Sequence, residues 1–131
     1  MTVMSVDIGF VSATDALVSF YQDVFGLEVL EPRVFPGGTV HRLALGTGAL
    51  KVMVPAQTPD PSTRTEHFWD RAGLRYVAMW LDDLDVIIDR WTTRGGTVAF
   101  GPITIREGVR TALLVDPDGN TVEAMHDAAM V

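Results

Sequence analysis

Glu123 is the residue whose position in the sequence raises the first chemical question. It lies in the stretch LLVDPDGNTVEAMH, where a strand-like apolar run is followed by a tight turn and a second strand-like run. If Glu123 faces inward, its ionised carboxylate needs a cation, a metal ion or a hydrogen-bond donor beside it, whereas a solvent-facing Glu needs none of these. An inward Glu123 is also a candidate general base.

Two other side chains could act together with Glu123. Lys51 is the only lysine among the 10 basic residues, and its ammonium could compensate a carboxylate or bind an anionic ligand group. The phenol of Tyr76 could donate a hydrogen bond to a ligand carbonyl. Structural roles stay open as well, because a lysine can keep its ammonium in water and a tyrosine can satisfy a buried backbone group. The candidate catalytic residues are therefore Glu123, Lys51 and Tyr76.

The composition limits the classes of protein that are possible. With 131 residues, of which 47% are hydrophobic and 21% charged, the chain is expected to fold as a single domain over residues 1–131. The absence of cysteine excludes disulfides and thiolate metal sites. The net charge of -7 argues against nucleic acid as a partner, and no stretch approaches the ~18 apolar residues of a membrane span. We expect a cytoplasmic protein with neither a nucleic-acid nor a membrane partner.

An internal repeat organises the chain. Residues 6–26, VDIGFVSATDALVSFYQDVFG, match the pattern of residues 76–96, YVAMWLDDLDVIIDRWTTRGG, without gaps at an offset of 76 − 6 = 70. Each copy begins like a strand and continues as an amphipathic helix. Gly26 and Gly96 are placed to end the two helices. The repeat predicts two structurally equivalent halves.

Three short strands are predicted after each helix. They centre on LEVLE, VHRLAL and ALKVMVP in the first half and on TVAFG, RTALLV and TVEAM in the second. The fold class is therefore α+β, with two tandem βαβββ modules. The first module is predicted over residues 1–56 and the second over residues 73–131. Residues 57–72, with Pro59 and Pro61, are predicted to be a linker containing one short helical turn.

The sequence resembles the vicinal oxygen chelate superfamily, which includes glyoxalase I, bleomycin resistance proteins and extradiol dioxygenases. The resemblance covers nearly the whole chain, and the motifs that carry it are FYQDVFGLEVL, GLRYVAMWLDDLD and DPDGNTVEA. The resemblance implies curved mixed sheets that enclose a cavity, with the helices outside and a small organic ligand inside. It also implies a homodimer.

In metal-dependent members, the resemblance implies that four equivalent strand positions supply His or Glu ligands to one divalent ion. These positions are Val6, Lys51, Tyr76 and Glu123 in this sequence. Only Glu123 suits the role, because valine has no lone pair, lysine is positively charged and a phenol is a poor ligand compared with imidazole or carboxylate. None of the three histidines falls at these positions. We expect no metal ion and no cofactor.

Alternation along the strands extends the predicted cavity wall, because residues two apart share a face. Counting from the four positions gives a wall that is apolar and aromatic with a few converging polar groups, a composition that suits a small organic ligand. His41 on the third strand is a further candidate, and filling of a closed interior is the competing interpretation for the apolar members. The predicted ligand-binding residues are Val6, Ile8, Phe10, His41, Lys51, Met53, Tyr76, Trp80, Glu123 and Met125.

Two functions from different classes follow. The favoured one is a metal-free protein that binds a small hydrophobic or aromatic molecule. The alternative is a metal-free isomerase, lyase or cyclase in which Glu123 abstracts a proton and Lys51 or Tyr76 stabilises the developing oxyanion. A metal-dependent enzyme of glyoxalase or dioxygenase type is the least favoured, since its ligand set is incomplete.

Overall fold

The computed structural model describes residues 2–131 and divides into two compact units, with the boundary between Ser62 and Thr63. This boundary falls inside the predicted linker of residues 57–72, where the structure has one 3-10 turn, η1, at Phe68–Asp70. Met1, where the predicted domain and first module begin, lies outside the described residues. Within residues 2–131, no helix is both long and apolar enough to span a membrane.

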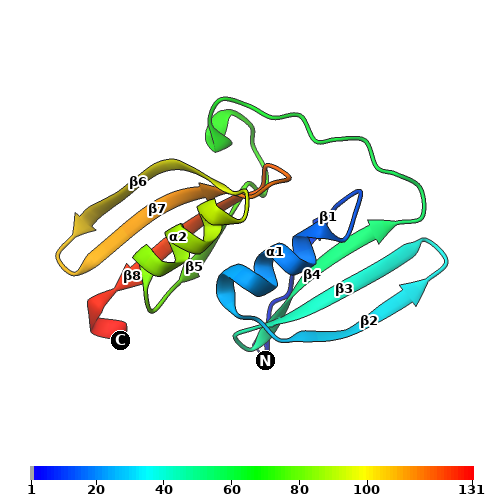
Figure 1. The fold of residues 1–131 in the computed structure, drawn as a ribbon, viewed down its shortest axis with the longest axis horizontal. Helices are drawn as coiled ribbons and strands as arrows, with labels where there is room; N and C mark the ends of the chain where they lie inside the picture. The colour runs from blue at the N-terminus through cyan, green and yellow to red at the C-terminus, as the bar shows by residue number, and fades with distance from the viewer. Residues whose placement is uncertain (1) are drawn as a thin grey trace. The chain divides into compact units, whose positions relative to one another are not determined.

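Unit 1, the part up to Ser62, consists of a strand, a helix and three further strands (Figure 1). The strand order in its sheet is β1-β4-β3-β2; β1 and β4 are parallel and the other pairs antiparallel, so the sheet is mixed. The elements are β1 (Ile8–Val11), α1 (Ala16–Phe25), β2 (Val29–Phe35), β3 (Gly38–Leu45) and β4 (Gly48–Pro55).

Helix α1 forms because its apolar residues recur at helical spacing and a glycine ends it. Its buried side chains are Leu17, Phe20, Tyr21 and Val24, which follow the i, i+3, i+4, i+7 spacing of one face. Tyr21 is fully buried and stacks on Phe10 of β1 with ring centroids 5.7 Å apart. Gly26 ends the helix with φ 66°, a left-handed conformation that favours glycine.

Unit 2 repeats this element order, and its strand order is β5-β8-β7-β6. Helix α2 begins after Asp83, whose side chain accepts a hydrogen bond from the Val86 N–H. The elements are β5 (Tyr76–Trp80), α2 (Leu84–Thr93), β6 (Thr97–Arg106), β7 (Val109–Val115), β8 (Thr121–Asp127) and a final 3-10 turn, η2 (Ala128–Met130).

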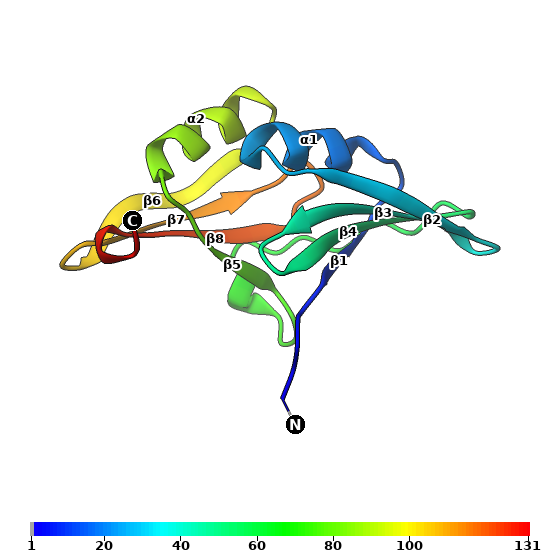
Figure 2. The ribbon, with the colours of Figure 1, turned by 90° about the horizontal axis from the view of Figure 1, so that it is seen from below.

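The α+β architecture predicted from the sequence, with two tandem βαβββ modules, is confirmed. Each helix packs on one face of its own sheet, and both sheets are curled (Figure 2). The helix pairing in the repeat also holds, because Leu17 and Ile87, and likewise Tyr21 and Trp91, are buried at an offset of 70 residues.

The DPDGN turn between β7 and β8 is built around Asp116. This carboxylate is 3% exposed and accepts hydrogen bonds at 2.9 Å from the N–H groups of Asp118 and Asn120 and from the Asn120 side-chain amide. A buried carboxylate needs such donors. The turn thereby fixes where β8 begins and places Glu123 two residues into that strand.

Candidate functional site

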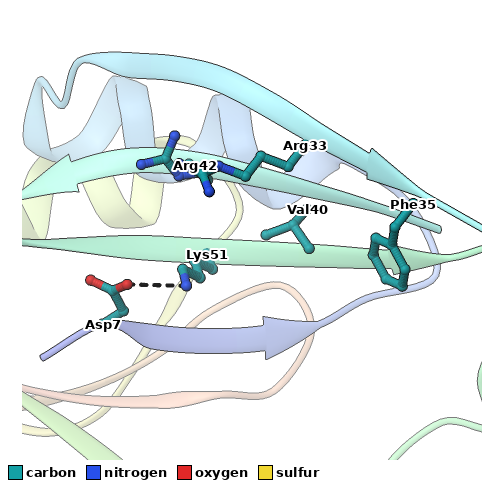
Figure 3. Close-up of a pocket in the computed structure, with 6 residues that line it drawn as sticks. All are labelled: Asp7, Arg33, Phe35, Val40, Arg42 and Lys51. Atoms are coloured by element: carbon teal, nitrogen blue, oxygen red, sulfur yellow. Dashed lines mark ion pairs between the residues drawn. The ribbon is translucent and has the colours of Figure 1, made fainter. Parts of the chain in front are cut away.

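The sheet of unit 1 has one face covered by α1 and one opposite face that carries most of the charged side chains. Laterally paired residues point to the same side of a sheet. Lys51 pairs with Gly9 of β1 and with Arg42 of β3, while Val40 pairs with Arg33 of β2. These side chains, together with Asp7 and Phe35, line one cavity of about 360 Å³. We call it the basic pocket, and its residues are Asp7, Arg33, Phe35, Val40, Arg42 and Lys51 (Figure 3).

An ion pair lies at one end of the basic pocket (Figure 3). The Nζ of Lys51 lies 3.0 Å from Oδ2 of Asp7, and the two side chains are 40% and 43% exposed. The other oxygen of Asp7, Oδ1, accepts a 2.9 Å hydrogen bond from the Ala49 N–H. The hydrogen bond from Lys51, followed by that from Ala49, holds the pKa of Asp7 below its ordinary value of 3.8.

No carboxylate among the described residues of unit 1 forms an ion pair with either arginine of the pocket, although the charge of Arg42 helps to hold the pKa of Asp7 down. Arg42 is half-buried, and its Nη1 donates to the backbone carbonyl of Glu31 at 3.4 Å. Arg33 is exposed, and its guanidinium makes no hydrogen bond or ion pair with another described residue of the unit. The pocket therefore holds three cations and one carboxylate, a local balance of 3 − 1 = +2, in a chain whose net charge is -7.

Asp7 is the site residue that sequence reasoning missed. The resemblance put Val6 among the four strand positions, and alternation from Val6 put Ile8 and Phe10 on the same wall as Lys51, but this face assignment was wrong. Ile8 pairs with Leu50 and Phe10 with Val52, and Phe10 stacks on Tyr21 of α1. The positions of this segment that share a face with Lys51 are Asp7, Gly9 and Val11.

A one-residue difference between the two units explains this error. The helices follow the offset of 70 residues, but the strand residues that pair with Lys51 and Glu123 are Gly9 and Ala78, an offset of 78 − 9 = 69. Because side chains alternate along a strand, an error of one residue exchanges the two faces. By strand register, Asp7 rather than Val6 is the counterpart of Tyr76.

The other two predicted residues of unit 1 divide between its faces. Met53 pairs with Val11 and Val40 and so lies on the Lys51 face, as predicted. His41 pairs with Val52, which places it on the α1 side of the sheet, half-buried and away from the basic pocket. Their roles in ligand binding stay predictions.

In unit 2, the predicted face holds. Glu123 pairs with Ala78 and Met125 with Trp80, so these residues share a face with Tyr76, opposite to α2. Tyr76 and Trp80 are 45% and 47% exposed, whereas Met125 is 6% exposed. The carboxylate of Glu123 is half-buried and has no hydrogen-bond or ion-pair partner among the described residues of its unit.

Aromatic side chains from the predicted linker contact this unit. The ring of Phe68 in η1 lies edge-on to Tyr76, with centroids 5.0 Å apart, and also contacts Trp69 at 5.0 Å. Trp69 in turn stacks on His67 at 4.4 Å. These contacts anchor η1 beside β5 and make an exposed aromatic surface next to Tyr76.

The four strand positions do not offer a donor set that fits a divalent metal ion. With Asp7 in place of Val6, the set contains two carboxylates, but Lys51 brings a cation and already engages Asp7 at 3.0 Å. Tyr76 offers only a phenol. Across residues 2–131, no group of three or more His, Asp or Glu side chains could hold a metal ion. The approach of Lys51 to Glu123 expected from the sequence stays a prediction, because the two residues belong to different units.

Comparisons with known proteins agree with the fold. A family model described as Glyoxalase/Bleomycin resistance protein/Dioxygenase superfamily matches residues 8–124. A "Probable lactoylglutathione lyase" from Synechocystis sp. is 22% identical over 122 residues, 88% of each chain. A glyoxalase family protein from Bacillus cereus has a TM-score of 0.79 at 13% identity, covering 97% of this chain and 96% of that one. TnmS3, an antibiotic binding protein from Streptomyces sp., has a TM-score of 0.65 at 22% identity, with 97% and 99% covered.

Proposed function

We propose that this chain, which belongs to the Glyoxalase/Bleomycin resistance protein/Dioxygenase superfamily, binds a small hydrophobic or aromatic molecule without the help of a metal ion. The observation that carries the proposal is the ion pair of Lys51 with Asp7 at 3.0 Å. A fixed ammonium repels a divalent cation and occupies the carboxylate that could have bound one. Shape complementarity and hydrogen bonds, rather than a metal ion, then hold the ligand.

The lining of the basic pocket supports a binding role. Phe35 and Val40 supply apolar surface, and the arginines and Lys51 supply donors. Small-molecule sites usually combine an apolar wall with a few polar groups in a volume of about 300–1,000 Å³, and the pocket measures about 360 Å³. Exposed Trp80 and Tyr76 add aromatic surface on the sheet of unit 2. TnmS3, which shares the fold, is an antibiotic binding protein, so this fold supports binding of small organic molecules.

The test is ligand binding with and without metal. A panel of small aromatic compounds is titrated into the purified protein by calorimetry, first with excess chelator and then with added Zn²⁺ or Ni²⁺. We expect at least one compound to bind with the same Kd in both conditions. Phe35→Ala should weaken that binding, whereas Val34→Ala, at an 81% exposed neighbouring position, should not. Binding that disappears with chelator would contradict the proposal.

A second candidate function is a metal-free enzyme with Glu123 as general base. It is favoured by the half-buried Glu123 carboxylate, which lacks a partner within its unit and shares a face with Tyr76. A base that abstracts a proton must be free to accept it. If a ligand found in the titrations is converted to product, Glu123→Gln should abolish turnover while leaving the Kd nearly unchanged. A Glu123→Gln protein that turns over normally excludes this role.

A further inference from the structure

The arrangement of charge within the basic pocket indicates the kind of ligand it takes. Lys51 forms an ion pair with Asp7. The excess positive charge of the pocket therefore comes from Arg33 and Arg42. Their strands are adjacent, and Arg33 pairs with Val40, two residues from Arg42 on the same face. Such diagonal neighbours lie within reach of long side chains, at about 7–8 Å between backbones. Two guanidinium groups that make no ion pair and extend from neighbouring strands on one face repel each other, and an anion between them removes this repulsion.

The apolar part of the pocket lies at its other end. Figure 3 shows Phe35 far from the Asp7–Lys51 pair, with Val40 between them. The register agrees, because Phe35 pairs with Gly38 near one end of β3 while Arg42 pairs with Lys51 farther along that strand. The pocket is therefore divided along the strands into a cationic end and an apolar end. A ligand that fits both ends must itself be amphipathic.

We propose that the ligand of the basic pocket is an aromatic monocarboxylate, with its carboxylate between Arg33 and Arg42 and its ring against Val40 and Phe35. This inference rests on the proposed binding function and adds the charge of the ligand. Guanidinium groups suit the assignment because their planar array of N–H donors matches the two oxygens of a carboxylate. The carboxylate of Asp7 repels a second negative charge at its end of the pocket, so a monoanion is preferred to a dianion.

The experiment compares aromatic ligands whose head groups differ in charge, with phenylacetate and phenylacetamide as the pair of matched shape. Phenylacetate, phenylacetamide and phenyl phosphate are titrated into the full chain by NMR, at low and at high salt. We expect phenylacetate to bind about tenfold more tightly than phenylacetamide, with the advantage shrinking as salt screens it. Phenyl phosphate should bind no better than phenylacetate. Phenyl phosphate binding more than tenfold tighter would overturn the carboxylate assignment.

Arginine variants locate the effect. Arg33→Gln and Arg42→Gln should each remove most of the difference between phenylacetate and phenylacetamide, because each weakens the binding of phenylacetate far more than that of phenylacetamide. Arg106→Gln is the matched control, because Arg106 is an exposed arginine on β6, outside the pocket. Thermal melts check that all three variants fold.

The outcomes separate this inference from the function on which it rests. Equal affinity for acid and amide, unaffected by either arginine variant, overturns the charge assignment and leaves metal-free binding of aromatic molecules intact. A charge preference that survives both arginine variants overturns the assignment of the pocket. If none of the three probes binds and no compound of the neutral aromatic panel binds either, both proposals are overturned.

Discussion

Lys51 of β4 and Asp7, the residue just before β1, form an ion pair in unit 1, with Nζ 3.0 Å from Oδ2. Asp7 precedes β1, and its second oxygen is fixed by the Ala49 N–H at 2.9 Å. The single lysine of the chain therefore has a carboxylate partner close to it in the fold and 44 positions away in the sequence (51 − 7 = 44). The pair ties the N-terminal segment to β4 and sets the charge of the basic pocket.

The first prediction concerns acid stability. The pKa of Asp7 lies below its ordinary value of 3.8 in the folded chain, so its stabilising effect is complete above that value and is lost as the pH falls through the folded pKa. Asp7→Asn should lower Tm at neutral pH by at most about 4 °C, because the pair is half-exposed. The gap to the unmodified protein should close as the pH falls through the lowered pKa of Asp7. Thermal melts across pH measure it, with Asp60→Asn, at an exposed linker position, as control. A gap that is constant with pH contradicts the pairing.

The second prediction concerns metal content. Because Lys51, one of the four strand positions, is a cation that already pairs with Asp7, the purified protein should carry no stoichiometric divalent ion, and chelator should leave its Tm unchanged. Elemental analysis after purification without chelator, together with melts in chelator, provides the measurement. Close to one Zn, Ni, Fe or Mn per chain, lost together with stability on chelation, would refute this prediction.

The helices and the turn could be predicted from the sequence because their determinants are local. The spacing of Leu17 and Tyr21 and the glycine that follows α1 specify a helix and its end without reference to other elements. Asp116 can hydrogen-bond to residues just after it in the same turn. Such features can be recognised from a few consecutive residues of the sequence, and they predicted the order of elements correctly in both units.

The face of β1 could not be read in this way. The strand contributes four residues, too few for alternation to identify a buried side, and the position of Val6 was taken from the resemblance by alignment on the helix and the DPDGN turn. The true offset between strand partners is one residue shorter than that between the helices. Phe10 therefore faces Tyr21 rather than the predicted wall, and Asp7 rather than Val6 lies on that wall. The pairing of Gly9 with Lys51 is a long-range property, and only the register of the sheet shows it.

The third prediction tests the close approach that positions Asp7. A Cβ on Gly48 would clash with the carbonyl oxygen of Val6, while a Cβ on Gly9 would meet nothing within 4 Å. Gly48→Ala should therefore push the N-terminal segment away and separate Asp7 from Ala49, at a cost of roughly 1–3 kcal/mol. Gly9→Ala is the control and should change the free energy of unfolding little. Urea denaturation compares the two, and equal effects would show that the approach is not needed.

The last prediction concerns Trp91, the largest fully buried side chain. Its Nε1–H lies between two backbone carbonyls, 3.1 Å from that of Thr97 and 3.0 Å from that of Val115, and so links α2 to the sheet of unit 2. Trp91→Phe keeps an aromatic ring but removes the only hydrogen-bond donor of the side chain. The two carbonyl groups then lose this donor, and the smaller ring leaves a void. The free energy of unfolding should fall by about 1–3 kcal/mol. Trp69→Phe, at a position that is 62% exposed, makes the same chemical change and should cost far less. Equal losses in the two variants would mean that the hydrogen bonds of Trp91 contribute nothing to the stability of unit 2.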